Sequence, residues 1–209
     1  NPPATLSALG IMINDTGTQQ QNNGIVALGA AVNVGVLGIT ITGSGSGCHN
    51  NRIYTDNDDS PLTVAGSIVV TDLGSGHSNF EITAAGTNAP IKVAGSVIYN
   101  NSPNTTGRSS VLITGRTDIT NSQVTIGGGL SINLAKTTGT ATDTDNANAN
   151  EVQLGESHGN VGAGYGLIVS GATAIIGGNG QDSLDVAEGQ FKAGISANLL
   201  SNPVDAADY

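Results

Sequence analysis

The sequence GSGCHNNRI at residues 45–53 is matched by GSGHSNFEI at residues 74–82, a step of 29 residues along the chain. A looser copy, TGRSSVLI, follows at residues 106–113, and a fourth, GNGQDSLDV, at residues 178–186. Self-similarity at a fixed period of about 20–50 residues is the signature of architectures that stack one structural repeat on the next. The fold class can therefore be argued from this phrase before any single residue is considered.

A second short phrase precedes the first and keeps the same step. Val36, Val64 and Val93 each begin a V-x-G sequence, at steps of 28 and 29 residues. If one repeat forms one coil, equivalent residues of successive coils lie side by side, about 4.8 Å apart in parallel strands. We therefore expect these three valines to stack inside the molecule. We expect the same of Ile53, Ile82 and Ile113, which end three copies of the first phrase.

The composition favours β-structure built from small aliphatic side chains. Aromatic residues make up only 3% of the 209 residues, and charged residues 11%, against about 25% in an average soluble domain. Short runs rich in Val, Ile and Thr recur every ten to fifteen residues and are bounded by Gly, Asn, Asp or Pro, which is the pattern of strands and turns. Helix signals are weak nearly everywhere.

Two all-β architectures fit that spacing. In a parallel β-solenoid, or β-helix, each coil of about 29 residues holds two or three short strands. In an antiparallel β-sandwich or jelly roll, the same strands pair across two sheets. The nearly gapless match between two copies favours the solenoid, because a stacked coil needs the same turn at the same place. We divide the chain into an N-terminal cap or arm (residues 1–23), a solenoid domain (24–200) and a C-terminal tail (201–209).

The charge pattern narrows the partners. The net charge is −10, and the six basic residues are scattered, which disfavours nucleic acid, whose phosphates select a basic stripe. No run of about 20 apolar residues exists, so we expect no membrane insertion. The single cysteine, Cys48, rules out a disulfide framework within the chain.

One segment matches a metal-binding phrase. Residues 177–185 (GGNGQDSLD) fit the nonapeptide G-G-x-G-x-D-x-U-x, whose stacked copies bind calcium. Asp182 and Asp185 are therefore the candidate calcium ligands, and we expect no other cofactor. Because each calcium ion sits between turns of neighbouring coils, the site needs several copies. His49, Ser78 and Ser109 stand at the position of Asp182 in the other copies, so a tight corner whose carboxylate accepts hydrogen bonds from turn amides is the alternative.

Catalytic signals are weak. His49, His77 and His158 lie beside Gly, Asn or Ser, which places them on exposed turns that do not converge. No G-x-S-x-G nucleophile motif occurs. We therefore expect a protein that is not an enzyme, with a polysaccharide-acting enzyme as the weakest of the functional alternatives and a carbohydrate-binding or shell-type sandwich as the second.

The ends of the chain suggest self-association. A solenoid leaves unpaired strands at its two ends, and these must be covered or paired with another molecule. Apolar residues occur near both ends of this chain, where we expect an interface formed by Leu9, Ile11, Ile13, Leu199 and Leu200. The expected partner is a second copy in an oligomer or fibre, and glycans are further candidate partners.

The alternation of V-x-G-x-I/V-x-V with G-x-G-x-x-N-x-x-I resembles the repeats of large secreted bacterial surface proteins, among them haemagglutinin-like and RTX-type adhesins. The resemblance covers residues 30–115 and, more loosely, residues 160–196. It implies a parallel β-solenoid, an extracellular or cell-surface location, and a structural or adhesive role.

Overall fold

The computed structural model describes residues 5–101, 108–134, 150–155, 165–178 and 182–199. These residues form strands and turns without a helix. The strands are β1 (Thr5–Asp15), β2 (Gln21–Ala27), β3 (Ala31–Gly43), β4 (His49–Thr55), β5 (Leu62–Val64), β6 (Ile68–Asp72), β7 (Ser78–Ala84), β8 (Ile91–Val93), β9 (Val97–Asn101), β10 (Ser109–Gly115), β11 (Val124–Ile126), β12 (Leu130–Asn133), β13 (Asn150–Leu154), β14 (Leu167–Val169), β15 (Thr173–Ile176), β16 (Asp182–Val186), β17 (Gly189–Phe191) and β18 (Ile195–Asn198).

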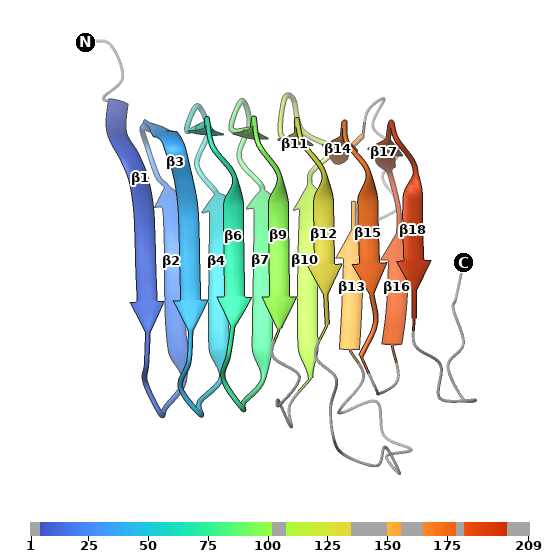
Figure 1. Ribbon diagram of the computed structural model, residues 1–209. Coiled ribbons are helices and arrows are strands. Elements are labelled where there is room, and N and C mark those ends of the chain that lie inside the picture. Colours follow the sequence, from blue (N-terminus) through green and yellow to red (C-terminus); the bar gives the residue numbers. More distant parts are fainter. Residues whose placement is uncertain (1–4, 102–107, 135–149, 156–164, 179–181, 200–209) are drawn as a thin grey trace.

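The strands stack side by side into three faces, each made of parallel strands (Figure 1). Face 1 is a six-stranded sheet in the order β2-β4-β7-β10-β13-β16. The long strand β3 joins the other two faces, because its first half pairs with β5 and its second half with β6. Face 2 continues from β5 through β8, β11, β14 and β17, and face 3 from β6 through β9, β12, β15 and β18. β1 lies along both halves of β3 at the N-terminal end.

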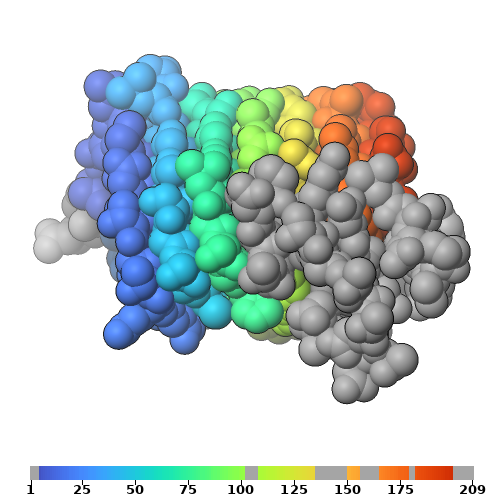
Figure 2. Space-filling model, turned by 60° about the horizontal axis from the view of Figure 1, so that its bottom comes forward, coloured from blue at the N-terminus to red at the C-terminus, as the bar shows by residue number. Residues whose placement is uncertain are grey.

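Every pairing between these strands is parallel, which confirms the β-solenoid and excludes the antiparallel sandwich. One row of face 1 shows the coil length directly: Gln21, His49, Ser78, Ser109, Asn150 and Asp182 are successive partners. The chain makes about five coils spaced roughly 29 residues apart. The longest step, from Ser109 to Asn150, contains residues 135–149, which lie outside the described part. Figure 2 shows the coils as successive bands of colour along the long axis.

The interior is filled by aliphatic rows, because alternate residues of every strand point inward. Ile53, Ile82 and Ile113 are direct partners in neighbouring strands and are completely buried, as the repeat predicted. Val64 and Val93 are also partners in face 2 and are buried. Between faces 1 and 3, the aromatic rings of Phe80 on β7 and Tyr99 on β9 stack at 5.5 Å between centroids.

The prediction for Val36 is wrong. The partner of Val64 is Val34, which is 2% exposed, whereas Val36 is 73% exposed. Four residues separate Val34 from the inward Ile39, but three separate Val64 from its counterpart Ile68. The additional residue forms an outward bulge at the corner between faces 2 and 3, which carries Val36 away from the core.

Residues 5–15 belong to the segment expected to form a cap or arm. They form β1, the outermost strand over faces 2 and 3 at the N-terminal end of the solenoid. β1 keeps the inward rows of faces 2 and 3, since Leu6 is paired with Val32 and Ile11 with Ile39. β2 begins at Gln21, within the same predicted segment. The predicted C-terminal tail, residues 201–209, lies outside the described part of the chain.

Candidate functional site

The N-terminal end of the solenoid presents an open strand edge. Among the described residues β1 pairs only with β3. Asp15 accepts a hydrogen bond from the backbone N–H of Ser44, so Asp15 belongs to the alternate residues whose backbone groups face β3. The backbone groups of Ile13, two residues earlier, also face β3, whereas Met12 and Asn14 are the alternate residues between and beside them. The backbone N–H and C=O groups of Met12 and Asn14 therefore point away from β3, toward the open edge.

Apolar side chains accompany this edge. Leu6 occupies an inward row but is 64% exposed, while its partner Val32 is 8% exposed, because β1 has a neighbour on one side only. Ile11 and Ile13 are half-buried and pack against the core. Leu9 lies at the corner beside the bulge and is 68% exposed. The N-terminal end thus exposes apolar side chains of inward rows that are buried in the other coils.

The C-terminal coil, formed by β16, β17 and β18, presents the opposite edge (Figure 1). Leu184, Phe191 and Leu199 are half-buried and pack against the core from this end. Val186 and Ile195 are 41% and 39% exposed. Each β-strand here has a described partner only on the side of the preceding coil.

The two ends share the same inward rows, and three of the four apolar rows in faces 2 and 3 have a large residue at one end and a small one at the other. The fourth row runs from Ile11 to Ile195. In face 2, the row that begins at Leu6 ends at Gly189, and the row that begins at Ala8 ends at Phe191. If a second copy continued the stack, a large side chain would meet a small one in both rows. In face 3, the row of Ile13 ends at Ala197 in the same manner. Alternation of large and small side chains across facing positions gives close packing.

The five predicted interface residues divide between these two ends. Leu9, Ile11 and Ile13 lie on β1, and Leu199 follows β18 directly. Leu200 lies outside the described residues. The structure does not bring the two sets together within one molecule, since they occupy opposite ends of the stack (Figure 1). Their role as an interface stays a prediction.

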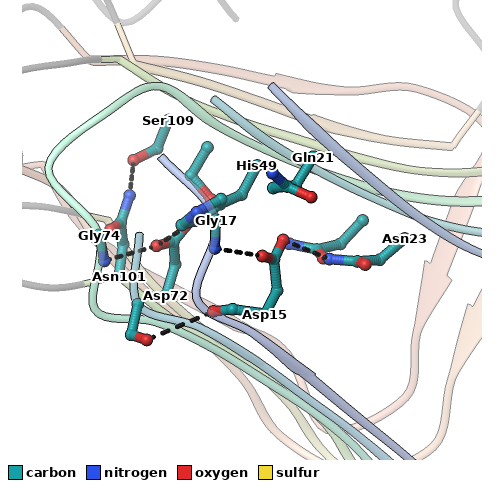
Figure 3. A network of polar contacts seen from close by, with 12 residues as sticks. Asp15, Gly17, Gln21, Asn23, His49, Asp72, Gly74, Asn101 and Ser109 are labelled. Atoms are coloured by element: carbon teal, nitrogen blue, oxygen red, sulfur yellow. Dashed lines mark hydrogen bonds and ion pairs between the residues drawn. The ribbon is translucent and has the colours of Figure 1, made fainter. Parts of the chain in front are cut away.

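A buried polar cluster lines the corner between faces 3 and 1 (Figure 3). His49 Nδ1 lies 2.8 Å from Asp72 Oδ1, and both side chains are at most 2% exposed. The same Asp72 oxygen accepts a hydrogen bond of 2.8 Å from the Gly74 N–H. A Cβ atom on Gly43 would lie 2.6 Å from His49 Nδ1, so glycine leaves the space that the imidazole ring occupies.

The position of His49 corrects the prediction that all three histidines lie on exposed turns. His49 precedes Ile53 by four residues on β4, so both side chains point to the same side of the strand. The His49 side chain therefore points inward in spite of the nearby glycines. His77 is exposed as expected, and His158 lies outside the described residues. His49 Nε2 and Asp72 Oδ2 are buried and have no hydrogen-bond partner among the described residues.

Similar polar contacts continue along this corner in both directions. Asn23 donates to Asp15 at 3.2 Å and to Asn51 at 3.1 Å on the N-terminal side. Toward the C-terminus, the buried hydroxyl of Tyr99 donates to Ser78 at 2.8 Å. A shift of one coil against the next would separate these buried donors from their acceptors, which costs free energy for each hydrogen bond lost. We interpret the corner as a device that fixes the register of the coils.

The two candidate calcium ligands do not converge. Asp182 is 3% exposed and points into the same polar corner, where it accepts hydrogen bonds from Asn150 Nδ2 at 2.7 Å and from the Gly178 N–H at 3.2 Å. Asp185 lies three residues further along β16 and is exposed on the outer side. The described residues contain no group of three or more His, Cys, Asp or Glu side chains that would hold a metal ion. A calcium role for Asp182 stays a prediction, while the turn-amide contact is present.

The outer surface of face 1 carries polar ladders. Asn79 donates to Asn50 at 2.6 Å, and Asn50 donates to Asn22 at 2.9 Å. Beside this ladder, Arg52 makes two hydrogen bonds to the Glu81 carboxylate at 2.7 and 3.0 Å, and these contacts raise the pKa of Arg52. The Arg52 side chain is 52% exposed, so this pair adds at most about 1 kcal/mol to stability.

Comparison of the chain with models of known protein families, with curated proteins and with solved structures found no match. In the described part of the chain, no helix is long and apolar enough to cross a membrane.

Proposed function

We propose that this chain is an extracellular structural or adhesive module that associates head to tail with copies of itself. The observation that carries the proposal is the match between its two ends. β1 offers a parallel edge over faces 2 and 3, and the last coil offers β17 and β18 over the same two faces. An interface that joins two different surfaces and does not close into a ring propagates as a filament.

The composition supports the same function. Native proteins protect exposed strand edges with charged side chains, proline or bulges. β1 carries a single ionisable side chain, Asp15, which is 8% exposed and faces inward. The edge that remains is long and uncharged, which favours the addition of another strand. The resemblance of the repeats to secreted bacterial adhesins supports an extracellular or cell-surface location. No catalytic role is proposed.

The substitution Met12→Pro tests the proposal. The Met12 N–H points toward the open edge, so proline removes a hydrogen-bond donor from that edge while the β1–β3 pairing keeps its own donors. We expect the wild-type protein to form a concentration-dependent series of oligomers in sedimentation velocity and Met12→Pro to remain monomeric. The β-type circular dichroism spectrum should be the same for both proteins.

Met12→Ala is the matched control. It removes the same side chain but keeps the backbone N–H, so it should associate as the wild type does. A wild-type protein that stays monomeric at all concentrations would contradict the proposal. Association of Met12→Pro at the wild-type level would contradict the assignment of the edge.

A further inference from the structure

A polar pocket of about 330 Å³ lies on the surface between two coils. It is lined by the connection from β10 to β11, residues 116–123, and by Tyr165, which precedes β14. Small-molecule sites have volumes of about 300–1,000 Å³, so this pocket suits a small ligand. It belongs neither to the two ends of the solenoid nor to the buried polar corner.

The backbone of this pocket is held from both neighbouring coils. On the N-terminal side, the Arg116 N–H and the buried Ser122 hydroxyl both donate to the carbonyl of Ala84, at 3.1 and 2.8 Å. On the C-terminal side, the Thr117 hydroxyl donates to Glu188 Oε2 at 2.7 Å. Sites held in their binding geometry before the ligand arrives lose less conformational entropy on binding. The wall is therefore preorganised although it is a loop.

Two charged side chains of the wall, Arg116 and Asp118, form an ion pair with no net charge. The Arg116 guanidinium makes two hydrogen bonds to the Asp118 carboxylate, at 2.9 and 2.5 Å, and these contacts lower the pKa of Asp118. The Arg116 and Asp118 side chains are 47% and 27% exposed, so polar edges of both reach solvent at the pocket. The carboxylate stays ionised at neutral pH and accepts hydrogen bonds there.

Two amide side chains and one aromatic ring complete the surface. Asn121 and Gln123 line the pocket and each carries both donors and acceptors. Asn121 has a φ of 53°, in the left-handed region that asparagine tolerates, and Asp59 and Asn88 adopt the same conformation in the preceding coils. Tyr165 also lines the pocket, is 48% exposed and adds an amphipathic ring.

We infer that this pocket binds one unit of a neutral saccharide. A sugar ring presents hydroxyls that both donate and accept, which the carboxylate, guanidinium and amide groups satisfy, and an apolar C–H face, which stacks on Tyr165. The ligand is uncharged because Asp118 neutralises Arg116, and because the chain carries a net charge of −10 that repels anions. A phosphate ligand would require an unpaired cationic group, and the lining is too polar for an apolar ligand.

Binding to a panel of glucose, galactose, mannose, N-acetylglucosamine and their short homo-oligomers tests this inference by titration calorimetry and saturation-transfer NMR. We expect at least one neutral sugar to bind the wild-type protein. Tyr165→Ala and Asp118→Asn should each weaken that binding at least tenfold. Tyr54→Ala, on the outer side of face 1, should leave it unchanged.

The inference does not rest on head-to-tail association, so Met12→Pro should bind the same sugar with the wild-type affinity. Absence of binding by every neutral sugar in the panel would overturn the inference. Unchanged affinity in both Tyr165→Ala and Asp118→Asn would also overturn it. Preference for an anionic sugar, with sialic acid and galacturonic acid as the probes, would contradict the neutral ligand class.

Discussion

Two valines that stand two residues apart provide a sharp test of the coil register. The repeat in the sequence predicts that Val36 is a core residue, but the structure buries Val34 to 2% exposure and leaves Val36 73% exposed. Val34→Ala and Val36→Ala are chemically identical changes. Only the register decides which of them destabilises the protein.

The magnitude follows from the groups that are lost. Val34→Ala removes two carbon atoms from a stacked row, worth about 0.8 kcal/mol each, and leaves a cavity between its partners Ala8 and Val64. We expect a loss of about 2–3 kcal/mol. For a chain of this length each kcal/mol lowers the melting temperature by about 2–4 °C, so the total decrease is roughly 4–12 °C. Val36→Ala should change stability by less than about 0.5 kcal/mol.

Thermal and urea unfolding measure the global effect, and amide hydrogen exchange measures the local one. The Ala65 N–H donates to the Val34 carbonyl at 2.8 Å, so its exchange reports on this coil even if the solenoid unfolds stepwise. Val34→Ala should accelerate exchange at Ala65, and Val36→Ala should not. An equal or larger destabilisation by Val36→Ala would refute the register.

Three further predictions concern the corners and the core. Gly38→Ala should destabilise the protein by more than about 2 kcal/mol in urea unfolding. Gly38 has a φ of 69°, and an added Cβ would lie 2.0 Å from a backbone oxygen of the next coil. Gly29→Ala is the control, because Gly29 has a similar φ of 71° but no atom within 4 Å of the added Cβ, so it should cost about 1 kcal/mol. Asp72→Ala should cost about 1–3 kcal/mol in urea unfolding, since it leaves a buried nitrogen of His49 without its hydrogen-bond partner. Asp72→Asn should cost less because an oxygen acceptor is kept, and equal losses would contradict the role of that oxygen. Burial raises the pKa of Tyr99 above that of a phenol in the unfolded chain, so stability should fall as the pH rises above about 10. Tyr99→Phe should reduce that fall in alkaline urea unfolding, and an unchanged pH dependence would contradict the assignment.

Much of the fold could be predicted because two coils match almost without gaps. The phrases at residues 45–53 and 74–82 align in the structure as they do in the sequence, with His49 beside Ser78 and Ile53 beside Ile82. The prediction that Asp182 shares the row of His49, Ser78 and Ser109 was also correct. The intervening partner Asn150 was missed, because the step from Ser109 to Asn150 is 41 residues and hides the repeat.

The errors have one physical origin, which is that glycine-rich phrases do not show on which side a residue points. The letters around Val36 match those around Val64, yet one additional residue at the corner changes the register there. His49 follows glycines typical of an exposed turn, but its parity with Ile53 directs it inward. Counting alternate positions back from Ile53 would have found it.

The pocket could not be predicted, because its parts are brought together by stacking. Arg116 and Asp118 are close in sequence, but Tyr165 comes from the following coil, which an irregular stretch of sequence separates from them. The matching ends of the solenoid were predicted only as apolar segments. The size complementarity of Leu6 with Gly189 depends on rows that run through every coil.

Head-to-tail association can be measured directly by cross-linking two outward positions of face 3. Met12 and Ser196 belong to the same outward row and are both exposed, but six strand spacings of about 4.8 Å, roughly 29 Å, separate them within one molecule. Met12→Cys and Ser196→Cys are prepared as separate proteins in a Cys48→Ser background, mixed, and treated with a short thiol cross-linker. We expect cross-linked pairs that contain one copy of each variant. Pairs of Met12→Cys with itself, or the absence of mixed pairs, would contradict it.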